Sequence, residues 1–164
     1  MNRRALLGSF GAVGAANLAG CLDGAVFEPA TTLGRLSVSN HDETAAHTFD
    51  LRVERDDTTV HESSHRVEQA TEGRIPGALA DCTWGAVAGM YAVHARVDGG
   101  EWNRVDRREQ TADLREEAEK SSGCVAVEVH YIPGETVSDP WNVLVHSCDR
   151  YDDRCGWVGE EAGE

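Results

Sequence analysis

The chain has 164 residues and a formal net charge of −14, with 29 acidic side chains against 15 basic ones. A surface of this sign repels the phosphates of nucleic acids and of anionic lipid headgroups, so neither is an expected partner. The length suits one domain with a modest hydrophobic core.

Residues 1–20 have the order of an export signal. Arg3 and Arg4 precede a run of sixteen uncharged residues that is interrupted by glycines. A helix needs ~20 apolar residues to cross the hydrocarbon core of a bilayer, so this run is too short for a permanent span. The segment is therefore predicted to be a cleaved signal peptide.

The signal ends in the tetrapeptide Leu-Ala-Gly-Cys, whose last residue is Cys21. It resembles the lipobox of exported lipoproteins, which implies cleavage before Cys21 and attachment of a lipid to its sulfur. The membrane is then a partner through the anchor, and the mature chain lies extracellularly, on the outer face of the cytoplasmic membrane. The paired arginines resemble a twin-arginine (Tat) signal, although a Sec signal remains open. The alternative is an ordinary secretory signal that a cysteine follows by chance.

The mature chain would carry 13 basic and 29 acidic residues, a formal charge of −16, and Lys120 is the only lysine of the sequence. The acidic residues are spread along the whole mature chain. With the twin arginines and the lipobox, this composition resembles the surface lipoproteins of halophilic archaea, most of which are uncharacterised. The resemblance implies a surface location and adaptation to high salt, and it implies no catalytic residues.

Alternating apolar and polar residues predict a β-sandwich domain over residues 33–155. Turn sequences such as Asp56-Asp57 and Asp98-Gly99-Gly100 separate the strands. Strands of this number bury their apolar faces best in two packed antiparallel sheets. The predicted fold class is all-β, an immunoglobulin-like two-sheet sandwich. The strand signals lie at residues 36–38, 49–53, 58–67, 87–97, 102–105, 125–131 and 143–145.

Three further segments complete the predicted domain organisation. Residues 21–32 would hold the lipidated cysteine and a short tether. Residues 113–120 are good helix formers with little apolar surface, which predicts a short connecting helix. Residues 156–164 are predicted to be a disordered acidic tail.

Four cysteines remain after Cys21, an even number that favours two disulfides in an oxidising compartment. A hairpin register that places apolar residues of 125–131 opposite those of 141–145 also places Cys124 opposite Cys148. Directly opposed residues are close enough to form a disulfide after small adjustment. We therefore favour Cys124 with Cys148 and, by elimination, Cys82 with Cys155. A loop closed by Cys148 and Cys155 is the main alternative.

The segment His61-Glu62-Ser63-Ser64-His65 matches the His-Glu-x-x-His motif of zinc metallopeptidases. That chemistry needs a helix, on which both imidazoles reach one Zn²⁺ and the glutamate activates water. The surrounding Thr and Ser residues favour a polar edge strand instead, on which His61 and His65 stand ~13 Å apart with parallel side chains. We therefore predict that the chain is not an enzyme. The alternative is a zinc-dependent hydrolase that uses His61, Glu62 and His65.

Histidines on the predicted hairpin are a second candidate for metal binding. His130 and His146 share its presumed outer face with Glu128, where a surface metal site is conceivable. Incidental histidines on a solvated face are the simpler interpretation. We predict neither a metal nor a cofactor.

The four tryptophans divide into two pairs. Trp102 and Trp141 are predicted to be core residues, because large aromatics in a small sandwich usually are. Trp84 and Trp157 lie next to Cys82 and Cys155, so the second disulfide would bring two indoles together as a candidate recognition patch.

The sequence therefore predicts a non-catalytic cell-surface lipoprotein. It would bind an envelope protein or a small ligand, or it would be a structural component of the envelope. No local motif in the mature chain specifies which ligand or partner it takes.

Overall fold

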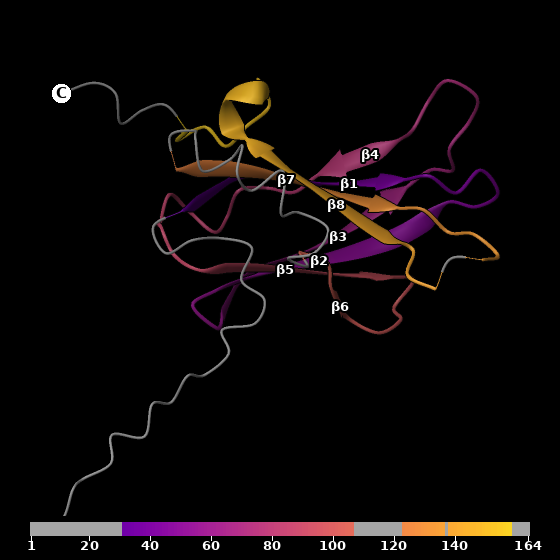
Figure 1. The fold of residues 1–164 in the computed structure, drawn as a ribbon, viewed down its shortest axis with the longest axis horizontal. Coiled ribbons are helices and arrows are strands. Elements are labelled where there is room, and N and C mark those ends of the chain that lie inside the picture. Colours follow the sequence, from indigo (N-terminus) through magenta and orange to yellow (C-terminus); the bar gives the residue numbers. More distant parts are fainter. Residues whose placement is uncertain (1–30, 107–122, 137, 159–164) are drawn as a thin grey trace, which may run out of the picture.

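The computed structural model describes residues 31–106, 123–136 and 138–158. The predicted signal peptide with Cys21, the predicted helix over 113–120 and the end of the predicted tail lie outside these residues. The described part is all-β, and two four-stranded sheets pack face to face around a hydrophobic core (Figure 1). The predicted all-β sandwich is confirmed.

The two sheets contain the strands in a mixed order. The first sheet consists of β4 (Gly77–Leu79), β1 (Thr32–Asn40), β7 (Cys124–Tyr131) and β8 (Trp141–Ser147), in that order. The second consists of β3 (Thr58–Val67), β2 (His47–Arg55), β5 (Tyr91–Val97) and β6 (Asn103–Arg104). Paired strands are antiparallel, except that β1 runs parallel to β7. A 3₁₀ turn, Cys148–Arg150, follows β8.

The alternation of side chains explains why these segments form strands. In β2, Phe49, Leu51 and Val53 are fully buried, and they alternate with the partly exposed Asp50 and Arg52. Successive side chains of a strand point to opposite faces, so one face of β2 packs on the core while the other meets solvent. The apolar faces of both sheets form one cluster of buried residues.

The hairpin of β7 and β8 has the register expected from the sequence, with Tyr131 opposite Trp141 and Val129 opposite Val143. The disulfides join Cys124 to Cys148 and Cys82 to Cys155, the two pairings favoured above.

A bulge in β1 lets this strand pass beneath the first disulfide. The pairing of β1 with β7 shifts at Gly34. A Cβ atom at Gly34 would stand 2.3 Å from the Cys124 sulfur and 2.4 Å from the Cys148 sulfur. Only glycine therefore allows the backbone of β1 to approach this disulfide so closely.

The sandwich has two different ends, which lie on the left and the right of Figure 1. The disulfide end contains both disulfides, the start of β1 and the turn between β2 and β3. The loop end contains the β1–β2 loop, the β3–β4 loop, the β5–β6 turn and the β7–β8 loop.

Several sequence predictions about single segments are wrong in detail. Trp141 is buried as predicted, but Trp102 is only partly buried and lies on the outer face of the second sheet. Its ring stacks against the guanidinium groups of Arg52 and Arg96, 4.2 and 4.6 Å from the ring centroid. The strand predicted over 87–97 begins only at Tyr91. The start of this strand was misplaced because an alternating pattern does not show where pairing with a neighbour begins.

The predicted tail begins too early. Trp157 and Val158 pack against the core, and the Val158 N–H donates to the carbonyl of Cys155. Cys155 in turn donates its own N–H to the carbonyl of Gly34. The disulfide to Cys82 therefore holds a segment that continues the domain to at least residue 158.

Candidate functional site

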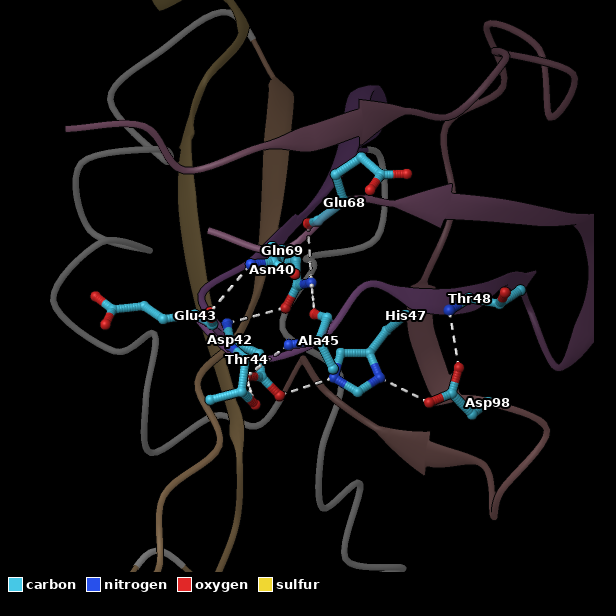
Figure 2. A network of polar contacts seen from close by, with 10 residues as sticks. All are labelled: Asn40, Asp42, Glu43, Thr44, Ala45, His47, Thr48, Glu68, Gln69 and Asp98. Carbon is cyan, nitrogen blue, oxygen red and sulfur yellow. Dashed lines mark hydrogen bonds and ion pairs between the residues drawn. The ribbon is translucent and has the colours of Figure 1, made fainter. Parts of the chain in front are cut away.

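A charged network joins two loops at the loop end, and Figure 2 shows its residues. His47, the first residue of β2, places Nδ1 2.6 Å from the Asp98 Oδ2 and Nε2 2.9 Å from the Asp42 Oδ2. Both ring nitrogens thus face carboxylate oxygens, and an imidazole can donate from both only when it is protonated. The imidazolium therefore ties the β1–β2 loop to the β5–β6 turn.

The pKa values of the three groups agree with this charged state. Burial by itself would lower the pKa of His47, but the hydrogen bonds and charges of Asp42 and Asp98 outweigh burial and raise it. The hydrogen bonds from Thr44 and His47 lower the pKa of Asp42. The backbone N–H of Thr48 and the imidazole of His47 lower the pKa of Asp98. With His47 protonated, the triad is two carboxylates around one imidazolium, with a net charge of −1.

Local hydrogen bonds fix the β1–β2 loop in the shape that presents Asp42. The second carboxylate oxygen of Asp42 accepts the backbone N–H groups of Thr44 and Ala45, at 2.7 and 3.3 Å. This is the Asx-turn pattern of aspartate in loops. From inside, the fully buried Asn40 donates its side-chain amide to the carbonyls of Ala45 and Glu68, at 2.9 and 3.0 Å.

The β5–β6 turn owes its shape to Asp98 and Gly99, which have φ angles of 50° and 71°. Two successive residues with positive φ make the type I′ turn that suits a hairpin, and the Asp-Gly pair is a favoured sequence for it. The N–H of Gly100 donates to the carbonyl of Val97 at 2.9 Å and closes the turn.

This turn and the β7–β8 loop enclose a pocket of about 390 Å³, within the ~300–1,000 Å³ range of small-molecule sites. Two of its lining residues, Glu101 and Asp139, are acidic, and a third, Trp141, is only 4% exposed. We call this cavity the loop-end pocket. Its lining residues are Val97, Gly100, Glu101, Asn103, Ser138, Asp139, Pro140 and Trp141.

Aromatic rings connect the charged network to the pocket. The ring centroids of His47 and Tyr131 are 5.2 Å apart, and those of Tyr131 and Trp141 are 5.1 Å apart. Phe49 contacts Tyr131 edge-on at 5.4 Å. Tilted and edge-on contacts at these distances are favourable for aromatic pairs. His47 therefore supports both the turn beside the pocket and the ring cluster behind it.

The His-Glu-x-x-His segment lies on the edge strand β3, as the sequence predicted. His61 and His65 do not stand parallel, because both rings lean toward Ser63 and place Nε2 2.9 Å from its hydroxyl oxygen. Glu62 points to the opposite face and pairs with Arg52 at 2.5 Å. The residues of this segment therefore do not gather a glutamate beside two imidazoles as the peptidase motif requires.

The two hairpin histidines also lie apart. His130 is paired with Asn142 across the hairpin and His146 with Ala126. His130 Nδ1 lies 2.8 Å from Nε2 of His41, and the buried His146 faces Arg150. In the described residues, no three or more His, Cys, Asp or Glu side chains are grouped so that they could hold a metal ion.

The candidate recognition patch of two indoles is not formed. Trp84 is 3% exposed, and its indole N–H donates to the carbonyl of Leu33 at 2.5 Å. Trp157 is partly buried against the core. Trp84 is buried because the chain that follows Cys82 turns inward, where its ring packs edge-on against His61 at 5.0 Å.

Sequence reasoning missed the residues that shape the loop end. The Asp98-Gly99-Gly100 turn was recognisable, but Asp98 and His47 are 51 residues apart and no local pattern relates them. The one available signal was that Asp42 and His47 flank a short polar segment between two predicted strands.

The described residues contain no helix that is long and apolar enough to cross a membrane. Comparison with protein-family models, with curated proteins and with solved structures finds no match to this chain.

Proposed function

We propose that this chain is a non-catalytic surface lipoprotein, exported and anchored through Cys21, whose sandwich binds a small ligand in the loop-end pocket. The order of arginines, uncharged run and Leu-Ala-Gly-Cys box supports export and lipidation. The dispersed acidic residues support a surface adapted to high salt.

The observation that carries this proposal is the position of the pocket relative to the start of the domain. Thr31 forms a bridge to Gly89, and β1 starts beside Cys124, so the chain enters the sandwich at the disulfide end. The pocket is lined by residues of the β5–β6 turn and the β7–β8 loop, two segments at the loop end on the right of Figure 1. An anchor at Cys21 leaves nine residues before Thr31, which span at most ~32 Å when fully extended. The anchor would hold the disulfide end near the membrane while the pocket faces away from it.

The chemistry near the pocket supports binding more than catalysis. Both nitrogens of His47 are engaged by carboxylates, so this imidazole has no free nitrogen to accept a proton from a substrate. The zinc hydrolase alternative would need Glu62 beside His61 and His65, but Glu62 faces Arg52.

Export and lipidation are tested by expressing the full-length chain and measuring the intact mass of the protein recovered from membranes. We expect loss of residues 1–20 and a mass increase that corresponds to lipid. The variant Cys21→Ala should leave the membrane fraction. A membrane-bound product that still carries Met1 would contradict the proposal.

The orientation is tested by energy transfer from a fluorophore to an acceptor lipid. Single cysteines are introduced at Thr58 of the disulfide end and at Glu101 of the loop end, both of which are exposed. We expect stronger transfer from the Thr58 position in the anchored protein. Equal transfer from both positions, or stronger transfer from Glu101, would contradict an outward-facing pocket.

A further inference from the structure

Two imidazoles meet where the β1–β2 loop leaves the first sheet. His41, the residue after β1, places Nε2 2.8 Å from Nδ1 of His130 on β7, and the ring centroids are 5.1 Å apart. The backbone N–H of His41 also donates to the carbonyl of Tyr131 at 2.9 Å. Both rings are only partly buried, so protons can reach them from solvent. These contacts attach the start of the loop to β7.

The hydrogen bond between the two rings requires that at least one imidazole is neutral. A neutral imidazole has one donor nitrogen and one acceptor nitrogen, whereas the protonated ring has two donors. Nε2 of His41 and Nδ1 of His130 can therefore bond while the pair carries no charge or one charge. When both rings are protonated, two N–H groups and two positive charges face each other, and the contact becomes repulsive.

A carboxylate on β7 faces the pair. Glu128 Oε2 lies 3.8 Å from Nε2 of His130, the ring nitrogen that does not contact His41. A carboxylate in this position attracts positive charge to His130. Arg35 on β1 pairs with the same carboxylate at 3.3 Å, which balances part of its charge. A second proton on the pair would therefore have to enter His41, on the side of the pair away from Glu128.

The other neighbours of the pair do not offset a second positive charge. His130 is paired with Ser39 on β1 and with Asn142 on β8, which are both uncharged. Within the loop, the Asp42 carboxylate is bound to His47. The pair therefore meets its second proton without a carboxylate from these neighbours.

Acid favours opening of this contact. Burial and the facing imidazole of His130 lower the pKa of His41 below its ordinary value of ~6.5. A His41 ring that has left His130 takes up its proton nearer that ordinary value. As pH falls below it, the open arrangement binds more protons than the closed one and gains stability. His47, at the other end of the loop, has the opposite requirement, because its two carboxylate contacts need the charged ring.

We propose that the β1–β2 loop is a pH-sensitive element with two attachments of opposite charge requirement. The contact between His41 and His130 holds the start of the loop to β7 only while one of the two rings is neutral. The contacts of His47 hold the end of the loop to the β5–β6 turn only while that ring is charged. Acidification therefore frees the loop from the first sheet and leaves it attached to the second. This inference goes beyond the proposed function and depends on neither the pocket nor the anchor.

The test compares two backbone amides by hydrogen exchange, in full-length protein in detergent at pH 7 and pH 5. The His41 amide bonds to the Tyr131 carbonyl, and the Thr48 amide bonds to the Asp98 carboxylate. Protection is taken relative to the unstructured chain at each pH, so that the intrinsic pH dependence of exchange cancels. We expect His41 to lose protection about tenfold at pH 5, which corresponds to one unit of pKa. Thr48 should lose none.

Two variants locate the effect in the ring pair. His130→Gln leaves a polar partner that cannot take up a charge, so the His41 amide should stay protected at pH 5. His65→Gln is the matched control, because it removes an imidazole from β3 of the other sheet. This control should lose protection at His41 as the wild type does.

Three results would overturn the inference. The first is protection at His41 that persists at pH 5 in the wild type, and the second is an equal loss in the wild type and in His130→Gln. The third is a loss at both His41 and Thr48, since the loop would then open as a whole. Nitrogen NMR shifts of the imidazoles give a check on the wild type that needs no variant. His41 and His130 rings that are both fully protonated while the His41 amide stays protected would contradict the repulsion between them.

Discussion

The two ends of the sandwich are held together by different kinds of interaction. At the disulfide end, one covalent bond joins the carboxy-terminal segment to Cys82, a second closes the open end of the β7–β8 hairpin, and Trp84 is buried in the core. At the loop end, charged hydrogen bonds around His47 tie two loops together. Disulfides do not titrate, whereas an imidazolium does. The difference teaches that the cross-links of the disulfide end do not change with pH, whereas the charged hydrogen bonds of the loop end do.

The contrast also suits the proposed division of roles. In the proposed orientation the disulfide end would receive the tether, so it would have to transmit any pull from the anchor without opening. The loop end carries the pocket, and loops positioned by a rigid scaffold are where binding residues concentrate. Each of the following variants alters one stabilising interaction at one end of the sandwich.

The largest effect is expected from opening the disulfide between Cys82 and Cys155. It closes a loop of 73 residues, against 24 for the bond between Cys124 and Cys148. In the chain-entropy model these loops correspond to about 4 and about 3 kcal/mol of stability. Replacing Cys82 and Cys155 by alanine should therefore lower the free energy of unfolding more than replacing the other pair. Urea unfolding of both variants gives the comparison, and the reverse order would refute this ranking.

A slightly smaller effect is expected where β1 passes the first disulfide. Gly34→Ala would place a methyl group within 2.4 Å of two sulfur atoms, and overpacking of this kind costs about 1–3 kcal/mol. Gly156→Ala is the matched control, because nothing lies within 4 Å of a Cβ atom there. Thermal unfolding should separate the two variants clearly. Equal melting temperatures would mean that β1 can move away from the disulfide.

Removing His47 should weaken the loop end and abolish the part of its stability that depends on the charge of this imidazole. The pKa of His47 is raised in the folded protein. Its contribution to the free energy of unfolding is therefore fully present below the unfolded pKa of ~6.5, and it is lost as pH rises through the higher folded pKa. His47→Gln should cost about 1–3 kcal/mol at pH 6, the range of hydrogen bonds to charged groups. The stability difference between wild type and variant should shrink toward pH 9.

Hydrogen exchange locates that effect. Amides of the β5–β6 turn should exchange faster in His47→Gln, while amides beside Cys148 should not change. Burial lowers the pKa of His61, so its contribution to the free energy of unfolding grows as pH rises, opposite to that of His47. Because both proteins contain His61, the difference between them isolates His47. A stability difference that does not vary between pH 6 and 9 would contradict the charged triad.

Sequence reasoning performed differently at the two ends for a physical reason. The pairing of Cys124 with Cys148 depends on a hairpin, in which neighbours in sequence are neighbours in space, so alternation alone sets the register. Once Cys124 and Cys148 are paired, Cys82 and Cys155 are the two cysteines left to form the second disulfide. The triad instead joins His47 to Asp98 across 51 residues and depends on two turns whose relative positions no local pattern encodes.

The same reasoning explains the errors in single residues. The parallel pairing of β1 with β7 joins segments about 90 residues apart, and it was not predictable from period-two alternation. Trp84 was placed on the surface because of its neighbour Cys82, but sequence proximity to a disulfide does not show which way a side chain turns. Trp102 is aromatic yet lies on the polar face, where two arginines cover it.

The smallest expected effect distinguishes the two carboxylates that hold His47. The Asp42 side chain is 14% exposed, whereas the Asp98 side chain is 55% exposed and meets more solvent screening. Asp98→Asn keeps an acceptor for the Thr48 N–H, and asparagine tolerates the positive φ of this turn position. We expect it to cost less than about 1 kcal/mol, with the loss reduced in molar salt. Asp42→Asn should cost more and depend less on salt, because less solvent lies around it. The reverse ranking in parallel salt titrations of unfolding would show that the turn, and not the β1–β2 loop, provides the main support of the imidazolium.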